Sequence, residues 1–259
     1  MITANELSRS FADVDAVSGI SFHVEPGTIY GLLGPNGAGK TTALRILATL
    51  LRPTGGQATV AGFDVVENPV EVRRNLGYLT GDTGLYQRLT PVEILRYFGN
   101  LHGMAPQRIT ARIAELTAAF QLGEFATRRC GKLSTGQRQR TSIARAMIHD
   151  PAVLILDEPT NGLDILSSQF ILQILRAERT RGKAVLFSTH ILSEAELLCD
   201  RIGLLHRGRL LFEGSVAEIL HHYECPSLPL AMLKAIAAVD PEAKALIETQ
   251  PKSLPEPHL

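Results

Sequence analysis

A glycine-rich run in the first fifth of the chain limits the possible folds more than any other feature. It reads Gly34-Pro35-Asn36-Gly37-Ala38-Gly39-Lys40-Thr41, followed by Thr42, and it matches the phosphate-binding pattern G-x-x-x-x-G-K-[ST]. Glycines let successive backbone N–H groups converge on an anion. The lysine adds positive charge for β- and γ-phosphates, and the threonine hydroxyl is a ligand for Mg²⁺. The loop needs a strand before it and a helix after it, because the positive end of the helix dipole then points at the phosphates.

The flanking sequence supplies both elements. Residues 28–33 form an apolar run that predicts a buried strand, and Leu44, Leu47 and Leu51 follow the loop at helical spacing. Strands predicted at 152–156 and 183–189 alternate with helices predicted at 165–179 and 193–199, and residues 201–213 indicate two short strands. This alternation is typical of an α/β fold with a mostly parallel sheet covered on both faces.

The rest of the chain divides into a strand-rich start, a helical middle and a proline-rich end. Strands are predicted at 17–24, 57–61 and 74–80, the last after a short helix. Residues 82–150 are predicted to be helical: Thr90, Pro91 and Glu93 form a capped helix start, and further helices are expected at 106–120 and 136–149. The tail from Cys225 contains one short amphipathic helix, predicted at 230–239, and a frayed end.

Composition limits the class of partner. The 259 residues include 26 Lys+Arg and 26 Asp+Glu, so the net charge is zero and there is no overall basic field for nucleic acid. Cys130, Cys199 and Cys225 are too few and too scattered for a disulfide framework or a zinc site, which fits a reducing cytosol. No signal peptide is visible and no apolar run approaches the ~18–20 residues that span a bilayer. If the protein works at a membrane, another chain must cross it.

A second motif places two carboxylates at the end of an apolar strand. Val153-Leu154-Ile155-Leu156 is followed directly by Asp157 and Glu158, and strand ends border the ligand crevice of an open α/β sheet. Neighbouring residues on a strand face opposite sides, so the two acids are not expected to share one ion. We therefore assign Asp157 to Mg²⁺ and Glu158 to an attacking water.

Together with four further segments, these motifs resemble the ATP-binding subunits of ABC transporters. Leu133-Ser134-Thr135-Gly136-Gln137 is similar to the family signature, Asn161-Gly162-Leu163-Asp164 to the D-loop, and Ser188-Thr189-His190 to the switch-histidine segment, while Phe11 stands where the family has an adenine-stacking aromatic. The resemblance covers residues 1–224 and implies a P-loop NTPase of the ABC ATPase type. It implies a RecA-like core with an antiparallel β region (1–81 and 151–224), a helical signature subdomain (82–150) and a separate tail (225–259).

The resemblance also implies roles for these residues. Asp157 and Thr41 would bind Mg²⁺, Glu158 would act as the base, and His190 would sense the γ-phosphate. The remaining ATP ligands would be Phe11, the loop from Gly34 to Thr42 (Gly34, Pro35, Asn36, Gly37, Ala38, Gly39, Lys40, Thr41 and Thr42), Ser134, Thr135, Gly136, Gln137 and Asp164. For Phe11, core packing is the alternative interpretation.

The family further implies how such a chain works. Two ABC ATPase subunits would pair head to tail, each lending its signature to the other's ATP, either as a homodimer or with a different cassette. ATP hydrolysis would drive transport, as export, through permease subunits on separate transmembrane chains. The protein would be cytoplasmic and peripheral on the inner face of the cell membrane. Tyr86, Leu89, Tyr97 and Phe98 are candidate contacts to the permease, with core packing as the alternative.

Two departures from the family pattern affect the predicted site. Thr135 replaces the first glycine of the signature, and Gly81 occupies the place of the Q-loop glutamine, a ligand that Asp82 or Gln87 would have to replace. The segment 79–86 resembles a subset of the family related to sodium and drug exporters.

Two other functions are weighed against transport. A soluble ABC-type ATPase acting on the ribosome or DNA is the main alternative, although the interval between Lys40 and Ser134 is too short for the coiled coil of DNA-repair relatives, and translation-type relatives usually carry two cassettes. A P-loop kinase or GTPase would leave the signature unexplained, and the guanine motif Asn-Lys-x-Asp is absent.

Overall fold

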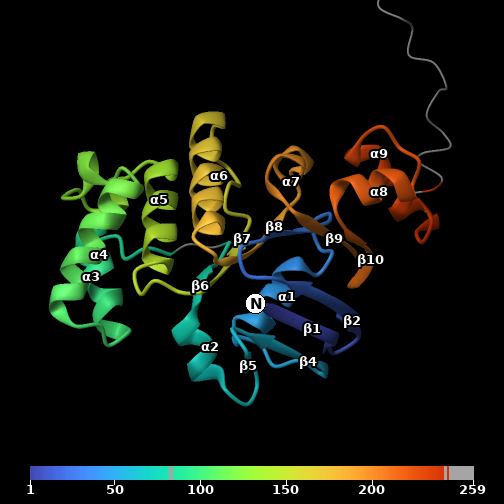
Figure 1. The fold of residues 1–259 in the computed structure, drawn as a ribbon, viewed down its shortest axis with the longest axis horizontal. Helices are drawn as coiled ribbons and strands as arrows, with labels where there is room; N and C mark the ends of the chain where they lie inside the picture. The colour runs from blue at the N-terminus through green and yellow to red at the C-terminus, as the bar shows by residue number, and fades with distance from the viewer. Residues whose placement is uncertain (82–83, 242–243, 245–259) are drawn as a thin grey trace, which may run out of the picture.

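A six-stranded sheet forms the centre of the computed structural model, which describes residues 1–81, 84–241 and 244 (Figure 1). Its order is β10-β9-β3-β8-β7-β6. The five strands β3 (Ile29–Leu33), β6 (Leu76–Leu79), β7 (Val153–Asp157), β8 (Ala184–Thr189) and β9 (Arg201–His206) run parallel, and β10 (Arg209–Gly214) is antiparallel to β9. Every residue of β3, β7 and β8 is buried, which explains their continuous apolar sequence. The predicted α/β fold is confirmed.

A smaller antiparallel sheet lies beside the first, as predicted for the N-terminal region. Its order is β2-β1-β4-β5, formed by β2 (Val14–Val24), β1 (Ile2–Phe11), β4 (Gly55–Val60) and β5 (Phe63–Asp64). Helix α1 (Lys40–Leu47) lies between the sheets, in contact with β7 on one side and with β2 and β4 on the other. Its buried stripe of Ala43, Leu44 and Leu47 belongs to the core shared by both sheets. The helix that follows the phosphate-binding loop is therefore fixed from two sides.

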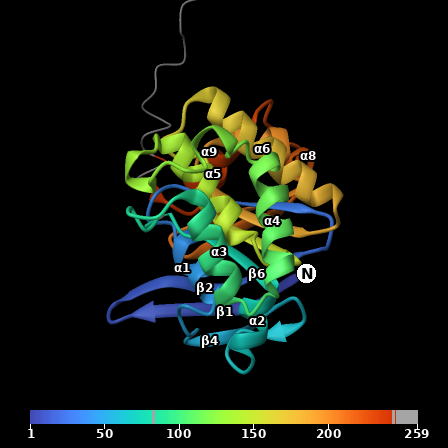
Figure 2. The ribbon, with the colours of Figure 1, turned by 90° about the vertical axis from the view of Figure 1, so that its left-hand side faces the viewer.

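The remaining helices lie on both faces and at one end of the large sheet (Figure 1). Helices α6 (Ile165–Thr180) and α7 (Leu192–Leu198) contact β3 and β8 on the face opposite α1. Helix α2 (Pro69–Asn75) contacts β5 and β6 on the same side as α1, where Val72 shares the core of α1. Helices α3 (Pro91–Leu101), α4 (Pro106–Ala119) and α5 (Thr135–Ala146) form a group at one end, nearest the viewer in Figure 2. Thr90 and Glu93 form the predicted capping box: the Glu93 N–H donates to Thr90 Oγ1 (3.3 Å), and the Thr90 N–H donates to Glu93 Oε2 (2.8 Å). Two short 3-10 helices, Gly123–Phe125 and Cys130–Lys132, lie between α4 and α5.

The C-terminal helices pack on the edge of the core. Helix α8 (Val216–His222) contacts β10, and α9 (Leu228–Ala237) contacts α7, α8 and β10. Leu228, Ala231 and Ala235 are buried in a cluster with Leu33 of β3. The helix begins at Leu228 rather than at 230 as predicted, because Pro229 is compatible with a first helical turn. The last ten residues, predicted to be frayed, lie outside the described ranges.

Several predicted strand boundaries shift by one to three residues: β2 begins at Val14 rather than at 17, β4 spans Gly55–Val60 rather than 57–61, and β6 starts later than predicted. The strand expected at 74–80 begins at Leu76, because Arg74 and Asn75 complete α2. Both side chains bond back to Glu71 one turn earlier: Arg74 Nη1 lies 2.6 Å from its carboxylate, and Asn75 Nδ2 donates to its carbonyl oxygen over 2.9 Å. Arg74 and Asn75, which the sequence pattern assigns to the strand, therefore belong to α2.

A network of ion pairs joins the helical group to the sheet. Lys183, at the start of β8, lies 2.8 Å from Asp150 and 2.9 Å from Glu178, while Arg112 of α4 lies 3.7 Å from Asp150. Arg112 also donates to the Met147 carbonyl at the end of α5 (2.9 Å). Lys183, Glu178 and Arg112 are buried, and buried charges are stable only when paired.

His149 provides a test of the packing between α3 and α5. Its ring stacks on His102 with centroids 3.7 Å apart, and its Nε2 is bonded to the Leu76 carbonyl at 3.2 Å. Burial, together with the charge of His102, lowers the pKa of His149 to about 4, below its ordinary 6.5. Between these values the unfolded chain binds a proton that the folded chain does not, so folding stability falls as the pH falls from 6.5 towards 4.

We expect the His149 contribution to the free energy of unfolding to fall by about 2 kcal/mol between pH 7 and pH 5. Urea denaturation of the wild type and of His149→Phe at both pH values measures it, with His23→Phe, a half-exposed histidine, as the control. The His149 variant should lose this part of the pH dependence, and an unchanged slope would contradict the assignment.

Candidate functional site

Two glycines fix the path of the phosphate-binding loop. Gly34 has φ 155° and Gly39 has φ 104°, and α1 begins directly after Gly39. A Cβ atom at Gly34 would overlap the Leu205 carbonyl of β9, and one at Gly39 would overlap the Ala16 carbonyl of β2. The loop therefore passes between the two sheets at a point where only glycine fits. The strand–loop–helix arrangement predicted from sequence is confirmed.

Lys40 lies folded against its own loop. Its Nζ donates to the carbonyl oxygens of Gly34 (2.7 Å) and Pro35 (3.0 Å), and it lies 3.8 Å from Glu158 Oε1. Burial lowers the pKa of Lys40, and the negative charges of Glu158 and Asp157 oppose this shift. The amine is thus placed at the mouth of the loop, beside both predicted acids.

The loop borders a cavity of about 380 Å³. Residues 36–42 of the loop line it together with the start of β2 (Val14, Asp15 and Ala16), Glu158, and the β9–β10 turn at Arg207 and Gly208. The floor is a helix N-terminus with loop N–H groups, which is a suitable environment for phosphate. The β9–β10 turn was not predicted as part of the site, because no local motif marks it.

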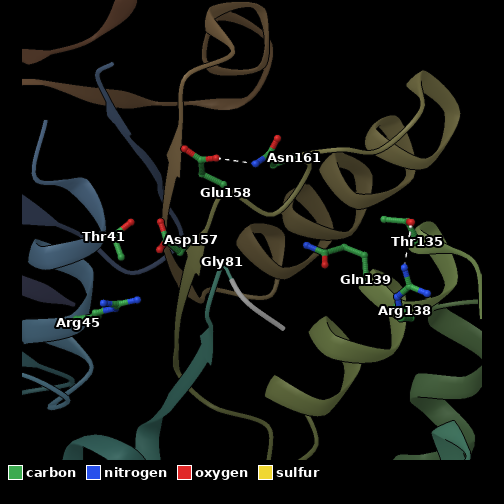
Figure 3. Close-up of a pocket in the computed structure, with 9 residues that line it drawn as sticks. All are labelled: Thr41, Arg45, Gly81, Thr135, Arg138, Gln139, Asp157, Glu158 and Asn161. Atoms are coloured by element: carbon green, nitrogen blue, oxygen red, sulfur yellow. Dashed lines mark hydrogen bonds between the residues drawn. The ribbon is translucent and has the colours of Figure 1, made fainter. Parts of the chain in front are cut away.

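A second cavity, of about 470 Å³, lies on the other side of Thr41 and is shown in Figure 3. Thr41 faces Asp157 at one side of it, and Gly81 lies close by. The opposite wall comes from α5. The full lining is Thr41, Arg45, Gly81, Thr135, Arg138, Gln139, Asp157, Glu158 and Asn161. The cavity thus joins the predicted metal ligands to the first turns of the signature helix.

Ser188 holds the two acids through one hydroxyl group. It donates to Asp157 Oδ1 over 2.6 Å and accepts the Glu158 backbone N–H over 3.0 Å. Asp157 is the last residue of β7, and Glu158 has φ 47°, in the left-handed region. The two carboxylates are therefore separated by this turn. The strand alternation invoked from sequence does not extend to Glu158, because the strand has already ended.

Glu158 and His190, predicted separately as base and γ-phosphate sensor, lie in contact. His190 Nδ1 lies 3.2 Å from Glu158 Oε1, and Asn161 Nδ2 donates to Glu158 Oε2 over 3.0 Å. Glu158 is one-fifth exposed, and it borders both cavities. Its carboxylate is therefore oriented by two side chains and is accessible from the phosphate-binding loop.

Sequence reasoning missed Glu194, a buried acid on α7. Its Oε2 accepts hydrogen bonds from Thr160 (2.8 Å) and from Thr189 (3.1 Å). Thr160 follows Glu158 by two residues and Thr189 precedes His190, so one carboxylate ties together the segments that carry both. No sequence signal marks this contact, because Glu194 reads as an ordinary helical glutamate.

The signature residues begin α5 with a capping box. Ser134 Oγ accepts from the Gln137 N–H (3.2 Å), and Gln137 Oε1 accepts from the Ser134 N–H (3.1 Å). A Cβ at Gly136 would lie 2.9 Å from Ser167 Oγ, which places α5 against the start of α6. Thr135 lines the second cavity, whereas the other three predicted signature ligands line neither of the two cavities described above.

Asp164 caps α6. Its carboxylate accepts from the Ser167 N–H (2.9 Å) and hydroxyl (2.7 Å), and these bonds lower its pKa. Asp164 lines neither of the two cavities described above, so within one chain its carboxylate acts as the N-cap of α6.

Phe11 lies outside the lining of the loop cavity. It is 41% exposed, so it is not a core residue, and the Arg9 guanidinium lies 4.5 Å from its ring centre. Exposure contradicts the core-packing alternative, while adenine stacking by Phe11 stays a prediction.

The Q-loop position is built around Gly81. A Cβ there would lie 3.6 Å from Asp157 Oδ2, an ordinary contact distance, so this position does face the predicted metal ligand. Gln87 packs against Gly131 and does not line the cavity, and Asp82 lies outside the described residues.

Comparisons with known proteins identify the family of the chain. A family model described as ABC transporter matches residues 17–161, which include the phosphate-binding loop, the signature, Asp157 and Glu158. The ATP-binding protein NatA of Bacillus subtilis (strain 168) is 44% identical over 224 residues, covering 85% of this chain and 91% of NatA. The chain belongs to the ABC transporter family.

Other relatives give the same result. The daunorubicin/doxorubicin resistance ATP-binding protein DrrA of Streptomyces peucetius is 41% identical over 84% of this chain and 66% of its own length. The probable multidrug ABC transporter ATP-binding protein YbhF of Escherichia coli (strain K12) is 39% identical over 83% of this chain and 37% of its own length, so the chain spans just over a third of that relative.

Solved structures identify the same fold. An ATP-binding subunit of an ABC transporter superposes with a TM-score of 0.84 at 28% identity, covering 91% of this chain and 99% of that chain. A dimeric ATP-binding cassette in a post-hydrolysis state with ADP and Pi superposes with a TM-score of 0.75 at 25% identity, covering 83% and 98%. The chain is thus an ABC ATPase, the ATP-hydrolysing subunit of a transporter. Among the residues that the structure describes, no helix has the length and apolarity to cross a membrane.

The position of Glu194 in this ABC ATPase leads to a prediction. Glu194→Ala should lower kcat about 10- to 100-fold, because the segments of Glu158 and His190, the two residues predicted to be catalytic, lose their common anchor, and small displacements of catalytic groups have effects of this size. The Kd for ATP should change little, since Glu194 lines neither cavity.

Steady-state ATPase assays and nucleotide titrations measure the two effects. Ser193→Ala, which removes an exposed hydroxyl group from the same helix, is the control. A parallel loss of ATP affinity, or the same loss of rate in Ser193→Ala, would contradict the positioning role.

Proposed function

We propose that the chain binds Mg·ATP at the loop from Gly34 to Thr42 and hydrolyses it with Glu158 as the general base. The observation that carries this proposal is the placement of Glu158 beside Lys40 and His190, at the border of the two cavities. Lys40 would hold the β- and γ-phosphates with the loop N–H groups. Glu158 would accept a proton from the attacking water, and His190 would orient Glu158 and contact the γ-phosphate.

We propose Thr41 and Asp157 as the protein ligands of Mg²⁺. Both line the second cavity and face each other, and Asp157 Oδ1 is oriented by Ser188. Mg²⁺ is usually held by one or two carboxylates with phosphate and water, so this sparse oxygen set fits the ion. Bound Mg²⁺ would neutralise charge on the phosphates during their cleavage.

We infer that two copies pair head to tail, with Ser134, Thr135, Gly136, Gln137 and Asp164 of one completing the ATP site of the other. Ser134 and Lys40 do not share a cavity within one chain, whereas the α5 N-terminus is a suitable anion site. Ile165 and Leu166, directly after Asp164, are each 81% exposed, and exposed apolar neighbours of this kind fit a subunit contact. A C2 pair of one chain gives two equal sites.

We propose that the domains divide as the motifs indicate, with residues 82–150 as the signature subdomain and the surface of Tyr86, Tyr97 and Phe98 as the contact to separate permease chains. Tyr86 and Tyr97 are 55% and 43% exposed and stack edge to face, and Phe98 stacks on Tyr97. Aromatic side chains that face solvent are typical of protein contacts. Leu89 is partly buried against the core beneath them.

We propose export as the direction of transport. Relatives include the daunorubicin/doxorubicin resistance protein DrrA and a Nod factor export ATP-binding protein of Rhizobium sp. (strain N33), which is 41% identical over 220 residues. Access to cytosolic ATP places such a chain on the inner face of the cell membrane.

Substitutions of Lys40 and Glu158 distinguish ATP binding from ATP hydrolysis. Lys40→Ala should weaken ATP binding about 100-fold, because a cation at the phosphates is lost. Glu158→Gln should keep ATP binding, lower kcat about 100- to 1000-fold and accumulate an ATP-bound dimer.

Nucleotide titration, phosphate release and light scattering with and without Mg·ATP measure these effects. Glu71→Gln, which neutralises an exposed acid on α2, serves as the control. Hydrolysis by Glu158→Gln at the wild-type rate would exclude Glu158 as the base, and unchanged ATP affinity in Lys40→Ala would exclude the site.

Gly81→Gln tests the missing Q-loop ligand. Because a side chain at this position meets Asp157 at ordinary contact distance, the glutamine has room, and its amide oxygen would add a ligand near Mg²⁺. We expect Mg²⁺-dependent hydrolysis to rise about fivefold, equivalent to ~1 kcal/mol.

Mg²⁺ titrations of the ATPase rate measure this change. Gly84→Gln is a matched control in the same segment, since a Cβ at Gly84 meets no atom within 4 Å. An equal rate in Gly81→Gln and wild type would show that another group already fills the position.

A further inference from the structure

The β9–β10 turn is built into the wall of the loop cavity. The Gly208 N–H donates to the Ala38 carbonyl of the phosphate-binding loop (2.9 Å), and the Gly208 carbonyl accepts from the Ser18 N–H (2.8 Å). Arg207 and Gly208 both have positive φ, 44° and 77°, as in a two-residue hairpin turn. The turn is therefore held on the loop from one side and on β2 from the other, and Arg207 lines the cavity beside them.

The C-terminal segment reaches this turn through one buried carboxylate. Asp240, just after α9, is 5% exposed. Its Oδ2 lies 3.0 Å from Arg207 Nη2 and 3.0 Å from His206 Nε2. The buried carboxylate therefore lies within ion-pair distance of the Arg207 guanidinium and of the His206 ring.

Helix α9 fixes the position of Asp240. The helix is anchored by Leu228, Ala231 and Ala235, which are buried against α7, β9 and β3. Asp240 continues from its end, with the Asp240 N–H bonded to the Ile236 carbonyl (2.9 Å). The ion pair therefore connects the packed helix α9 to the wall of the loop cavity.

The chemistry of Arg207 fits the part of the nucleotide that the loop does not hold. The β- and γ-phosphates are assigned to Lys40 and the loop N–H groups, so the ribose and α-phosphate would extend towards the other lining residues, where β2 and Arg207 lie. A guanidinium has a planar set of donors that matches phosphate oxygens and sugar hydroxyls. An arginine that is two-thirds exposed would otherwise lose side-chain entropy on binding, and the contact with Asp240 reduces that loss.

We propose that Arg207 is a ligand for the ribose and α-phosphate region of the bound nucleotide, and that Asp240 is the positioning residue that holds it there. The C-terminal segment thereby sets the affinity of the ABC ATPase for nucleotide through the Arg207–Asp240 ion pair. The inference rests on the proposed ATP site at the loop from Gly34 to Thr42.

A double-mutant cycle tests the proposal in the full chain. Fluorescence titration measures Kd for ATP and for ADP in the wild type, Arg207→Ala, Asp240→Asn and the double variant. Arg207→Ala should weaken ATP and ADP binding by the same factor, about five- to tenfold, because the contact does not involve the γ-phosphate. Asp240→Asn should weaken both about twofold to threefold, and the double variant should match Arg207→Ala alone.

Each departure from this pattern overturns a stated part of the proposal. Unchanged affinity in Arg207→Ala excludes it as a ligand, and tighter binding in Asp240→Asn means that Asp240 competes with nucleotide for Arg207. If the effects of Arg207→Ala and Asp240→Asn on Kd are additive, Asp240 does not act through Arg207, and its role is purely structural. A loss confined to ATP assigns Arg207 to the γ-phosphate instead.

Two controls keep the interpretation specific. Glu213→Gln breaks the ion pair of Arg201 and Glu213 (3.1 Å) in the same hairpin, away from the loop cavity, and should leave both Kd values unchanged. Lys40→Ala separates the two proposals. If Lys40→Ala binds ATP like the wild type, the proposed ATP site itself is wrong. If Lys40→Ala loses ATP binding while Arg207→Ala binds ATP normally, only the new inference is rejected. Thermal unfolding identifies a misfolded Asp240→Asn, and in that case Arg207→Ala, a change at an exposed side chain, still decides the ligand role.

Discussion

The phosphate-binding loop runs through a gap between two sheets that leaves no space for a side chain at Gly34 or Gly39. Carbonyl oxygens from β9 and β2 close this gap on the two sides. Because α1 starts directly after Gly39 and is packed between the same sheets, its N-terminus has one possible direction. This path of the loop fixes the position of Lys40, the border between the two cavities and the contact with the β9–β10 turn.

Much of this arrangement could be predicted because its determinants are local. The spacing of glycines around Lys40 requires a strand, a turn and a helix, and an apolar run that ends at Asp157 requires a central strand whose end faces the ligand. Similar reasoning placed the capped start of α3 at Thr90 and Pro91, since a capping box is encoded within four residues. Parallel strands then bring these ends to one edge of the sheet, whatever the details of their connections.

The remaining parts of the site depend on contacts between distant segments. Ser188 lies inside a fully buried strand and gives no sign, in the sequence, that its hydroxyl reaches Asp157 and Glu158. Glu194 and Asp240 are acids in ordinary helical surroundings, and only the packing of α7 and α9 shows what they bond. The alternation rule failed at Glu158 for a related reason: it holds only while a strand continues, and the left-handed turn that ends β7 is fixed by tertiary contacts.

These distant contacts converge on the segment from Glu158 to Asp164. Glu158 contacts Lys40 and His190, Thr160 bonds Glu194, and the Pro159 carbonyl accepts from Gln139 of the signature helix at 2.6 Å. At the proposed ATP site, Glu158 is therefore connected to α5 by a short series of contacts that does not pass through the sheet. Because the sheet interior is close-packed and resists deformation, this segment offers a direct physical connection between the proposed nucleotide site and α5. The aromatic surface of Tyr86 and Tyr97 lies on α3, which packs on α5, or directly before it, so chemistry at Glu158 and a mechanical output to a membrane partner would share one short path.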